Sequence, residues 1–267
     1  MSQYYKILPD SLICRGFQYQ EGLNIHPKGM KPCVDADGFY FSDAAHILQF
    51  CDVACKRTNI AEVELPEDAV ICHSSRYQYK ADKIILKNIR PLWCTKTLED
   101  LIKNGVNILQ YKDPIFYDAC QFGVMDVVRC FVEHGVDIHS LDEWALSMAI
   151  LSGRLDIVQY LVDHGADVHA GYGWGLYLAA AYGCSKVLEY LIEQGVDISG
   201  HESMLLSRAA FFDDVHTLQL LLDHGVDIHT DNDIALKTAE KFDRLNAVEF
   251  LVKNGANISA CREPFVH

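Results

Sequence analysis

The chain has 267 residues, of which 50% are hydrophobic, enough for a core in one or two domains. No apolar stretch reaches the roughly 18 residues that a membrane span requires. The N-terminal segment MSQYYKILPD also lacks the basic and apolar regions of a signal peptide. These features predict an intracellular protein in which the ten cysteines are mostly reduced thiols.

The net charge of −14 is unevenly distributed along the chain. Residues 1–91 contain 11 Lys and Arg against 11 Asp and Glu, whereas residues 92–267 contain 12 against 26. An acidic surface repels a phosphate backbone, so we expect no nucleic acid on the second part of the chain. The same surface would attract a basic protein partner. Acidic residues that serve only solubility would give the same composition.

Residues 1–90 are predicted to form a small α+β domain with a mostly antiparallel sheet. Residues 61–65 alternate between apolar and charged, as in a half-buried strand. The candidate strands are residues 4–8, 16–20, 38–42, 60–66, 68–72 and 82–88. A helix is expected over residues 43–51, with Asp43 as its N-terminal cap.

A fixed step of thirty residues organises the rest of the chain. Six glycines end a stretch of the form apolar-apolar-x-x-Gly and precede a Val/Ala-Asp/Asn-Ile/Val sequence: Gly105, Gly135, Gly165, Gly195, Gly225 and Gly255. The alanines Ala119, Ala149, Ala179, Ala209 and Ala239 keep the same step. A period of this length indicates stacked repeats, each of which buries its apolar face against its neighbours.

Each repeat is predicted to contain two helices. In residues 141–170, the first helix should end at Gly153, and the second should begin near Asp156 and stop at Gly165. The second helix has an apolar stripe formed by Ile157, Val158, Leu161 and Val162. The in-phase alanine fits a place where paired helices approach closely.

These repeats resemble the ankyrin repeat through the patterns A-L-x-x-A-x-x-x-G and x-I-V-x-Y-L-V-x-H-G-A-D-V-H. The resemblance implies that residues 91–267 form an all-α ankyrin-repeat solenoid. It contains a half repeat, 97–110, and five full repeats, 111–140, 141–170, 171–200, 201–230 and 231–260. The family repeat usually has 33 residues, and the three missing here fall between His139 and Trp144. We therefore expect the β-hairpin of the family to be trimmed to a tight loop.

The resemblance also implies a protein partner, bound on the concave side formed by first helices and loop tips. The aromatic residues expected there are Tyr111, Trp144, Tyr172, Trp174, Tyr177 and Tyr182. Exposed Trp and Tyr side chains are frequent anchors of interfaces. Trp144 and Trp174 replace a residue whose usual role is structural, so packing between adjacent repeats is the alternative for both.

Histidines recur at two repeat positions, His134, His164 and His224 at one and His139, His169 and His229 at the other. Neighbouring repeats should stand about 8–10 Å apart, whereas zinc needs its nitrogen ligands at about 2 Å. Equivalent histidines therefore cannot share an ion. We expect them to fix local turns, and we expect neither a metal nor a cofactor.

Over nearly its full length the sequence resembles the ankyrin-repeat proteins of giant amoeba-infecting DNA viruses, the mimivirus type. The matching segments are YYKIL, GFQYQEGLN, GFYFSD, EVELPEDAV and YKADKIIL, joined to repeats that read LVDHGADVH. The resemblance implies a non-enzymatic adaptor that binds host proteins in the host cytoplasm. The virion and the nucleus are the other locations to consider, and a structural role in the virion is a further alternative.

A second resemblance offers an alternative function. Residues 21–25, 37–43 and 50–51 are similar to the nicotinamide-binding region of the poly(ADP-ribose) polymerase family. This similarity implies an ADP-ribosyltransferase-like domain, with nucleotide-binding positions at Arg15, Gly16, Tyr40 and Phe50. The carboxylate that would stabilise an oxocarbenium-like transition state is missing from residues 74–80. No catalytic residue is therefore assigned.

Overall fold

The computed structural model describes residues 3–27, 38–51 and 58–257, including the backbone but not the side chains of residues 111–113. The chain divides into two compact units, Met1–Asp137 and Ile138–His267. Each unit is considered separately below. The predicted division at residue 90 separates two kinds of sequence and stays a prediction.

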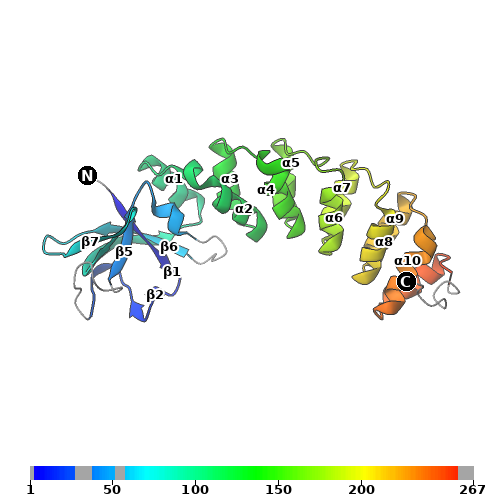
Figure 1. Cartoon of the computed structure of the whole chain (residues 1–267), viewed down its shortest axis with the longest axis horizontal. Helices are drawn as coiled ribbons and strands as arrows, with labels where there is room; N and C mark the ends of the chain where they lie inside the picture. Colours follow the sequence, from blue (N-terminus) through cyan, green and yellow to red (C-terminus); the bar gives the residue numbers. More distant parts are fainter. Residues whose placement is uncertain (1–2, 28–37, 52–57, 258–267) are drawn as a thin grey trace. The chain divides into compact units, whose positions relative to one another are not determined.

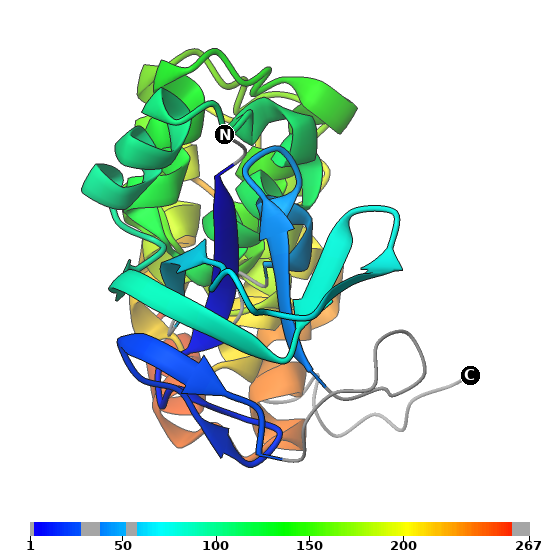
Figure 2. The ribbon, with the colours of Figure 1, turned by 90° about the vertical axis from the view of Figure 1, so that its left-hand side faces the viewer.

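In the described part of the first unit, seven strands form one antiparallel sheet in the order β4-β9-β6-β1-β5-β8-β7 (Figures 1 and 2). The strands are β1 Tyr4–Pro9, β4 Gly22–Ile25, β5 Phe39–Asp43, β6 Thr58–Glu64, β7 Ile71–Ser75, β8 Gln78–Ala81 and β9 Lys83–Pro91. The predicted antiparallel sheet is therefore confirmed. Strand β8 lies in a segment that the sequence did not identify as a strand.

The sheet buries one contiguous apolar cluster. Leu8 of β1, Phe39 and Phe41 of β5, and Ile84 and Leu86 of β9 all belong to it. The alternation predicted for residues 61–65 is present in β6, where Ala61 and Val63 are buried and Glu64 is exposed. Period-two alternation thus places one set of side chains in the core, as expected for a half-buried strand.

The prediction of a helix over residues 43–51 is wrong. The structure has only a short 3₁₀ helix there, η1, at Ile47–Phe50. Strand β5 continues through Asp43, and the Asp43 carboxylate accepts a hydrogen bond from the backbone N–H of His46 at 3.0 Å. The same oxygen lies 2.7 Å from the His46 ring nitrogen Nδ1. The bond to the His46 amide is the contact that an N-cap residue makes, so Asp43 caps this turn as expected, but the segment continues only as the 3₁₀ helix η1.

Strands β2, Ile13–Cys14, and β3, Phe17–Gln18, form a small separate hairpin. Its two-residue turn consists of Arg15 and Gly16, whose φ angles of 51° and 79° are both left-handed. A turn with two positive φ angles matches the twist of the strands, and it usually contains Asn, Asp or Gly. Arginine at its first position is unusual.

The remainder of the first unit is helical. The elements are α1 Thr95–Lys103, η2 Ile108–Tyr111, α2 Lys112–Phe122 and α3 Met125–Glu133. Helix α1 packs on α3 and buries Leu98 and Leu101 completely. It therefore takes the place of the second helix of a repeat, as predicted for the half repeat.

The second unit consists of helix pairs in sequence order (Figure 1). The pairs are α4 Ser140–Leu151 with α5 Leu155–Asp163, α6 Trp174–Ala181 with α7 Ser185–Glu193, α8 Glu202–Phe211 with α9 Val215–Asp223, and α10 Thr230–Lys241 with α11 Leu245–Lys253. First helices contact the next first helix along the chain, and second helices contact the next second helix. The predicted stacking of repeats is confirmed here.

Helix α5 follows the predicted pattern closely. Ile157, Val158 and Leu161 are fully buried, and Val162 is half-buried. The helix ends at a left-handed Gly165, with φ of 103°. The amide of Ala166 donates to the carbonyl oxygen of Leu161 at 3.0 Å, as in a Schellman cap.

Tight left-handed turns replace hairpins in the second unit. No β-strand lies between the helix pairs of residues 138–257. Residues 141–143, 171–173 and 231–233 instead have three consecutive positive φ angles, between 47° and 85°. The left-handed conformation is unfavourable for residues other than glycine, so each turn needs compensating contacts.

Histidine–carboxylate pairs supply such contacts in two of the turns. His139 Nδ1 lies 2.5 Å from Oε1 of Glu143, and His229 Nδ1 lies 3.0 Å from Oδ1 of Asp233. Asp233 also accepts a hydrogen bond from the backbone amide of Asn257 at 3.0 Å. At the other histidine position, the Nδ1 atoms of His134, His164 and His224 lie 2.7–2.8 Å from the carbonyl oxygen four residues earlier. The prediction that these histidines fix local turns agrees with this geometry.

The aspartate that follows each Gly-Val/Ala pair has a similar role. Carboxylate oxygens of Asp167, Asp197 and Asp227 accept hydrogen bonds at 2.8–2.9 Å from the backbone N–H two residues later. These are the contacts of an Asx turn, which aspartate favours. They explain why the repeat keeps this residue in phase.

Asp213 and Asp243 occupy the position held by glycine in the earlier repeats. Both are left-handed, with φ of 58° and 54°. The Asp213 carboxylate also accepts a hydrogen bond from the backbone N–H of Ala247 at 2.7 Å, near the start of α11. One residue therefore ends α8 and caps a helix of the next repeat. Within residues 138–257, the Asp243 carboxylate makes no such bond.

We predict that Asp213→Ala lowers the free energy of unfolding by about 0.5–2 kcal/mol more than Asp243→Ala. Both variants place alanine in a left-handed conformation, but only the first removes a helix cap, and the expected difference is the value of that cap. Chemical denaturation followed by circular dichroism measures it. Equal losses of unfolding free energy for the two variants would show that the Asp213 cap does not contribute to stability.

We also predict that Ala179→Leu destabilises the chain by about 1–3 kcal/mol, because Ala179 is buried where α6 packs among its neighbours and a larger side chain overpacks the contact. Ala181→Leu, at the half-buried end of the same helix, serves as the control. Thermal denaturation compares the two. A neutral effect of Ala179→Leu would contradict the close packing.

Candidate functional site

A groove in the second unit lies between the first helices α4 and α6. It has a volume of about 330 Å³, and both Trp144 and Trp174 line it. Trp144 follows the left-handed kink at 141–143 near the start of α4, and Trp174 begins α6 after the left-handed turn at 171–173. The trimmed turns therefore bring two tryptophans from consecutive repeats to one surface.

The two tryptophans are partly packed and partly exposed. Trp144 is 42% exposed and Trp174 is 47% exposed. Trp174 stacks on Tyr177, with ring centroids 5.2 Å apart and an interplanar angle of 14°. Trp174 thus packs on a neighbouring ring, and both tryptophans keep exposed area. A role of either ring as an interface anchor stays a prediction.

The groove carries negative charge. Among its described lining residues, Asp142, Glu143 and Asp167 are acidic and none is Lys, Arg or His. Glu143 is only 6% exposed, whereas Asp142 and Asp167 are exposed. An aromatic surface beside carboxylates suits a guanidinium or ammonium group, because the ring faces and the carboxylates both attract cations.

The other predicted aromatic residues lie elsewhere. Tyr172 is 98% exposed in the loop before α6, beside the groove residue Gly171. Tyr182 is exposed just after the end of α6, whereas Trp174 is at its start. The eight residues of this helix span about 12 Å, so the two aromatic residues lie apart. The side chain of Tyr111 lies outside the described residues.

A second hollow between α8 and α10 has the opposite charge. It has a volume of about 270 Å³, and Arg208, Lys237 and Lys241 line it together with Phe211 and Phe242. Its lining includes no described carboxylate. Residues 92–267 have a net negative charge, but this hollow is basic. The net charge of the segment could not predict such a site.

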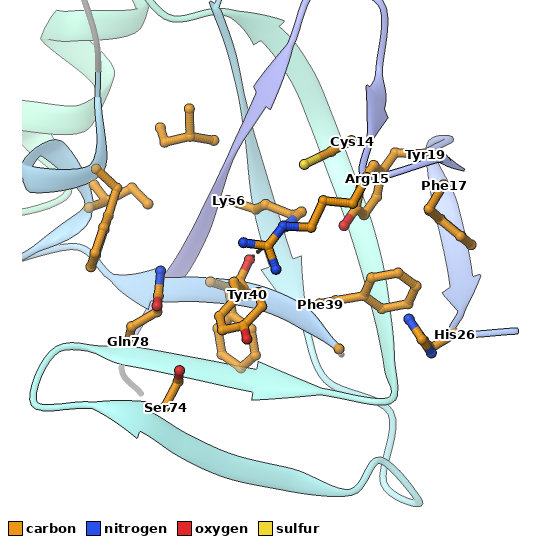
Figure 3. Close-up of a pocket in the computed structure, with 15 residues that line it drawn as sticks. Lys6, Cys14, Arg15, Phe17, Tyr19, His26, Phe39, Tyr40, Ser74 and Gln78 are labelled. Atoms are coloured by element: carbon orange, nitrogen blue, oxygen red, sulfur yellow. Dashed lines mark hydrogen bonds between the residues drawn. The ribbon is translucent and has the colours of Figure 1, made fainter. Parts of the chain in front are cut away.

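A cleft of the first unit lies on the sheet and has a volume of about 480 Å³ (Figure 3). Arg15, Tyr40 and Phe50, three of the four positions assigned from the second resemblance, line it. Gly16 does not line the cleft and instead forms the second residue of the β2–β3 turn. The residues Ser74 and Gln78, from the segment without a carboxylate, also face this cleft.

Lys6 is the residue of this cleft that the sequence did not identify. Its side chain is buried, and Nζ donates a hydrogen bond to the carbonyl oxygen of Tyr40 at 2.7 Å. The same ammonium lies 4.8 Å from the centroid of the Tyr19 ring. Burial lowers the pKa of Lys6 from 10.5 to about 8. The sequence marked residues 4–8 only as a candidate strand.

Comparison with known proteins identifies the class. A sequence profile described as ankyrin repeats, in three copies, matches residues 94–171 and 176–260, more than half of the chain. The chain belongs to the ankyrin-repeat family.

Two particular relatives can be named. An ankyrin repeat protein of Acanthamoeba polyphaga mimivirus is 29% identical over 147 residues, which cover 51% of this chain and 69% of that protein. The crystal structure of the ankyrin repeat domain of human ASB11 has a TM-score of 0.47 and 21% identity, covering 53% of this chain and 69% of that one. The predicted similarity to a giant-virus ankyrin protein is thereby confirmed.

Within the described ranges, no helix has both the length and the apolar character needed to cross a bilayer.

We predict that Lys6 makes stability depend on pH. Because the pKa of Lys6 is lower in the folded chain, the unfolded chain holds more protons between about pH 8 and 10.5, and stability gains from rising pH in this window. Replacement by methionine removes this gain. The stability of the Lys6→Met variant relative to the unsubstituted chain should therefore fall by about 2 kcal/mol between pH 7 and 9.5.

Urea denaturation at several pH values measures this difference. Groups shared by the two chains, among them Tyr19, Cys14 and Arg15 beside Lys6, cancel to first order in the comparison. Parallel stability curves for the two chains would show that Lys6 titrates near its ordinary pKa.

Proposed function

We propose that the chain is a non-enzymatic adaptor that binds a basic segment of a protein partner through the groove between α4 and α6. Ankyrin repeats typically mediate protein–protein interactions, which gives the general class of function. The observation that carries the proposal is the meeting of two half-exposed tryptophans with three carboxylates in one groove. An arginine or lysine flanked by apolar residues fits this chemistry.

The energetics favour a small number of anchors. Trp174 is held by its stack on Tyr177, so binding would immobilise little additional side-chain freedom. Burial of the remaining ring area and cation–π contact with an arginine would then contribute directly to affinity. The exposed carboxylates Asp142 and Asp167 would chiefly accelerate association and select basic sequences.

The partner is proposed to be a host protein, met inside the infected cell. This part of the proposal rests on the similarity to a mimivirus protein. The basic hollow between α8 and α10 would contact an acidic or polar part of the same partner. A partner with a basic and an acidic segment in tandem therefore fits the surface better than a uniformly basic one.

We predict that the double variant Trp144→Ala/Trp174→Ala loses at least about 30-fold in affinity for its partner segment, as expected for removal of anchors worth 2 kcal/mol or more. The probe is an array of peptides that pair Arg or Lys with apolar residues, followed by titration of the best peptide against the full chain. Affinity should also fall as salt rises.

Tyr182→Ala removes an exposed aromatic ring from the far end of α6 and is the matched control. The second measurement is capture of proteins from an Acanthamoeba lysate. Proteins bound by the unsubstituted chain should be lost with the double variant and retained with Tyr182→Ala. Retention of the same proteins by the double variant would place the interface elsewhere. A preference for acidic peptides on the array would contradict the proposed chemistry.

A further inference from the structure

The cleft on the sheet of the first unit has the size of a small-molecule site. Its volume of about 480 Å³ falls within the range of roughly 300–1,000 Å³ typical of ligand pockets. Its walls come from β1, the β2–β3 turn, β5, η1, β7 and β8. Several separate segments thus converge on one hollow beside the core of the sheet.

Two positive side chains, Lys6 and Arg15, line this cleft, and none of its described lining residues is a carboxylate. Figure 3 shows the Arg15 guanidinium between the Lys6 side chain and the Tyr40 ring. The guanidinium carbon lies 5.5 Å from the centroid of that ring. Arg15 makes no ion pair with any described residue, and Lys6 donates to a neutral carbonyl oxygen. Among the described lining residues there is no Asp or Glu.

Such an arrangement is costly in the absence of an anion. Lys6 is only 6% exposed, and a buried ammonium without a carboxylate loses hydration that a neutral acceptor replaces poorly. Its lowered pKa has the same cause, because burial disfavours the charged form. A bound anion would restore favourable interactions with both Lys6 and Arg15.

The rest of the lining suits a flat, polar ring system. Phe50 lines the cleft and is partly exposed, so its ring can stack on a planar ligand. Ser74 and Gln78 supply a hydroxyl and an amide from the β7–β8 side (Figure 3). An amide both donates and accepts hydrogen bonds, as recognition of a nucleobase edge requires.

We propose that this cleft binds a nucleoside phosphate, with its phosphate against Arg15 and Lys6 and its base among the aromatic side chains, Ser74 and Gln78. The site is independent of the groove between α4 and α6. It is a binding site, and the proposal includes no chemical step.

The turn that carries Arg15 allows a variant that should fold. Arg15 has a φ of 51° at the first position of a two-residue turn, where asparagine is favoured. Arg15→Asn therefore removes the cation and relieves an unfavourable backbone conformation. Loss of binding in this variant could not be attributed to loss of the hairpin.

Arg76 provides the matched control. It lies in the two-residue loop between Ser75 and Gln78 of the β7–β8 hairpin and is exposed. Its guanidinium carbon lies 5.2 Å from the centroid of the Tyr77 ring, and it does not line the cleft. Arg76→Asn thus removes the same charge and the same kind of aromatic contact from the same unit.

The experiment is isothermal titration of the full chain with AMP, GMP, CMP and UMP, with adenosine, and with inorganic phosphate. At least one nucleotide should bind, with an affinity at least 10-fold higher than that of inorganic phosphate. If AMP binds, its affinity should also be at least 10-fold higher than that of adenosine. Arg15→Asn should weaken nucleotide binding at least 10-fold, Lys6→Met should also weaken it, and Arg76→Asn should leave it unchanged.

Three results would overturn the proposal. The first is an absence of binding by all four nucleotides at millimolar concentration. The second is equal binding of nucleotide and inorganic phosphate, which would define a simple anion site. The third is an equal effect of Arg15→Asn and Arg76→Asn, which would place the nucleotide outside the cleft.

Discussion

The short helices of the repeats cannot bury their own apolar faces, and this constraint underlies the structure of residues 138–257. Helix α5 has nine residues, fewer than the 12–15 at which an isolated helix becomes even marginally stable. Its buried residues Ile157, Val158 and Leu161 are shielded only because α4 and α7 pack beside it. Stability in such an array is a sum of contacts between neighbours.

The shortened repeat places unusual demands on the loops between helix pairs. With three residues fewer than the usual ankyrin repeat, the chain passes from one second helix to the next first helix through left-handed turns. Buried carboxylates paired with histidine, such as Glu143 with His139, hold these turns. The same turns set Trp144 and Trp174 at the starts of their helices, so the binding groove follows from the way the loops are shortened.

Much of this fold could be predicted from the sequence because repetition reveals it. The step between glycines located both helices of each repeat. The leading sheet offered only weak local patterns, so strand β8 was not identified and the helix over residues 43–51 was wrong. The Asp43 cap expected for that helix is present, but the segment after it continues only as the short 3₁₀ helix η1.

The sites were predicted less completely, because they depend on which side chains converge. The sequence identified the aromatic residues by type. Composition predicted a uniformly acidic surface, whereas the structure has an acidic groove between α4 and α6 and a basic hollow between α8 and α10. Lys6 gave no signal in the sequence, since a lysine on a strand is ordinarily a solvated residue. Its significance appears only when β1, β5 and the Arg15 turn are seen together.

Hydrogen exchange of the full chain, read by mass spectrometry across residues 138–257, tests the central claim that each helix pair is held by its neighbours. The account predicts graded opening free energies, highest in the α6–α7 and α8–α9 pairs, each of which has a neighbouring pair on both sides within these residues, and lower in α10–α11. A single opening free energy shared by all four pairs would show one indivisible core and would contradict the account.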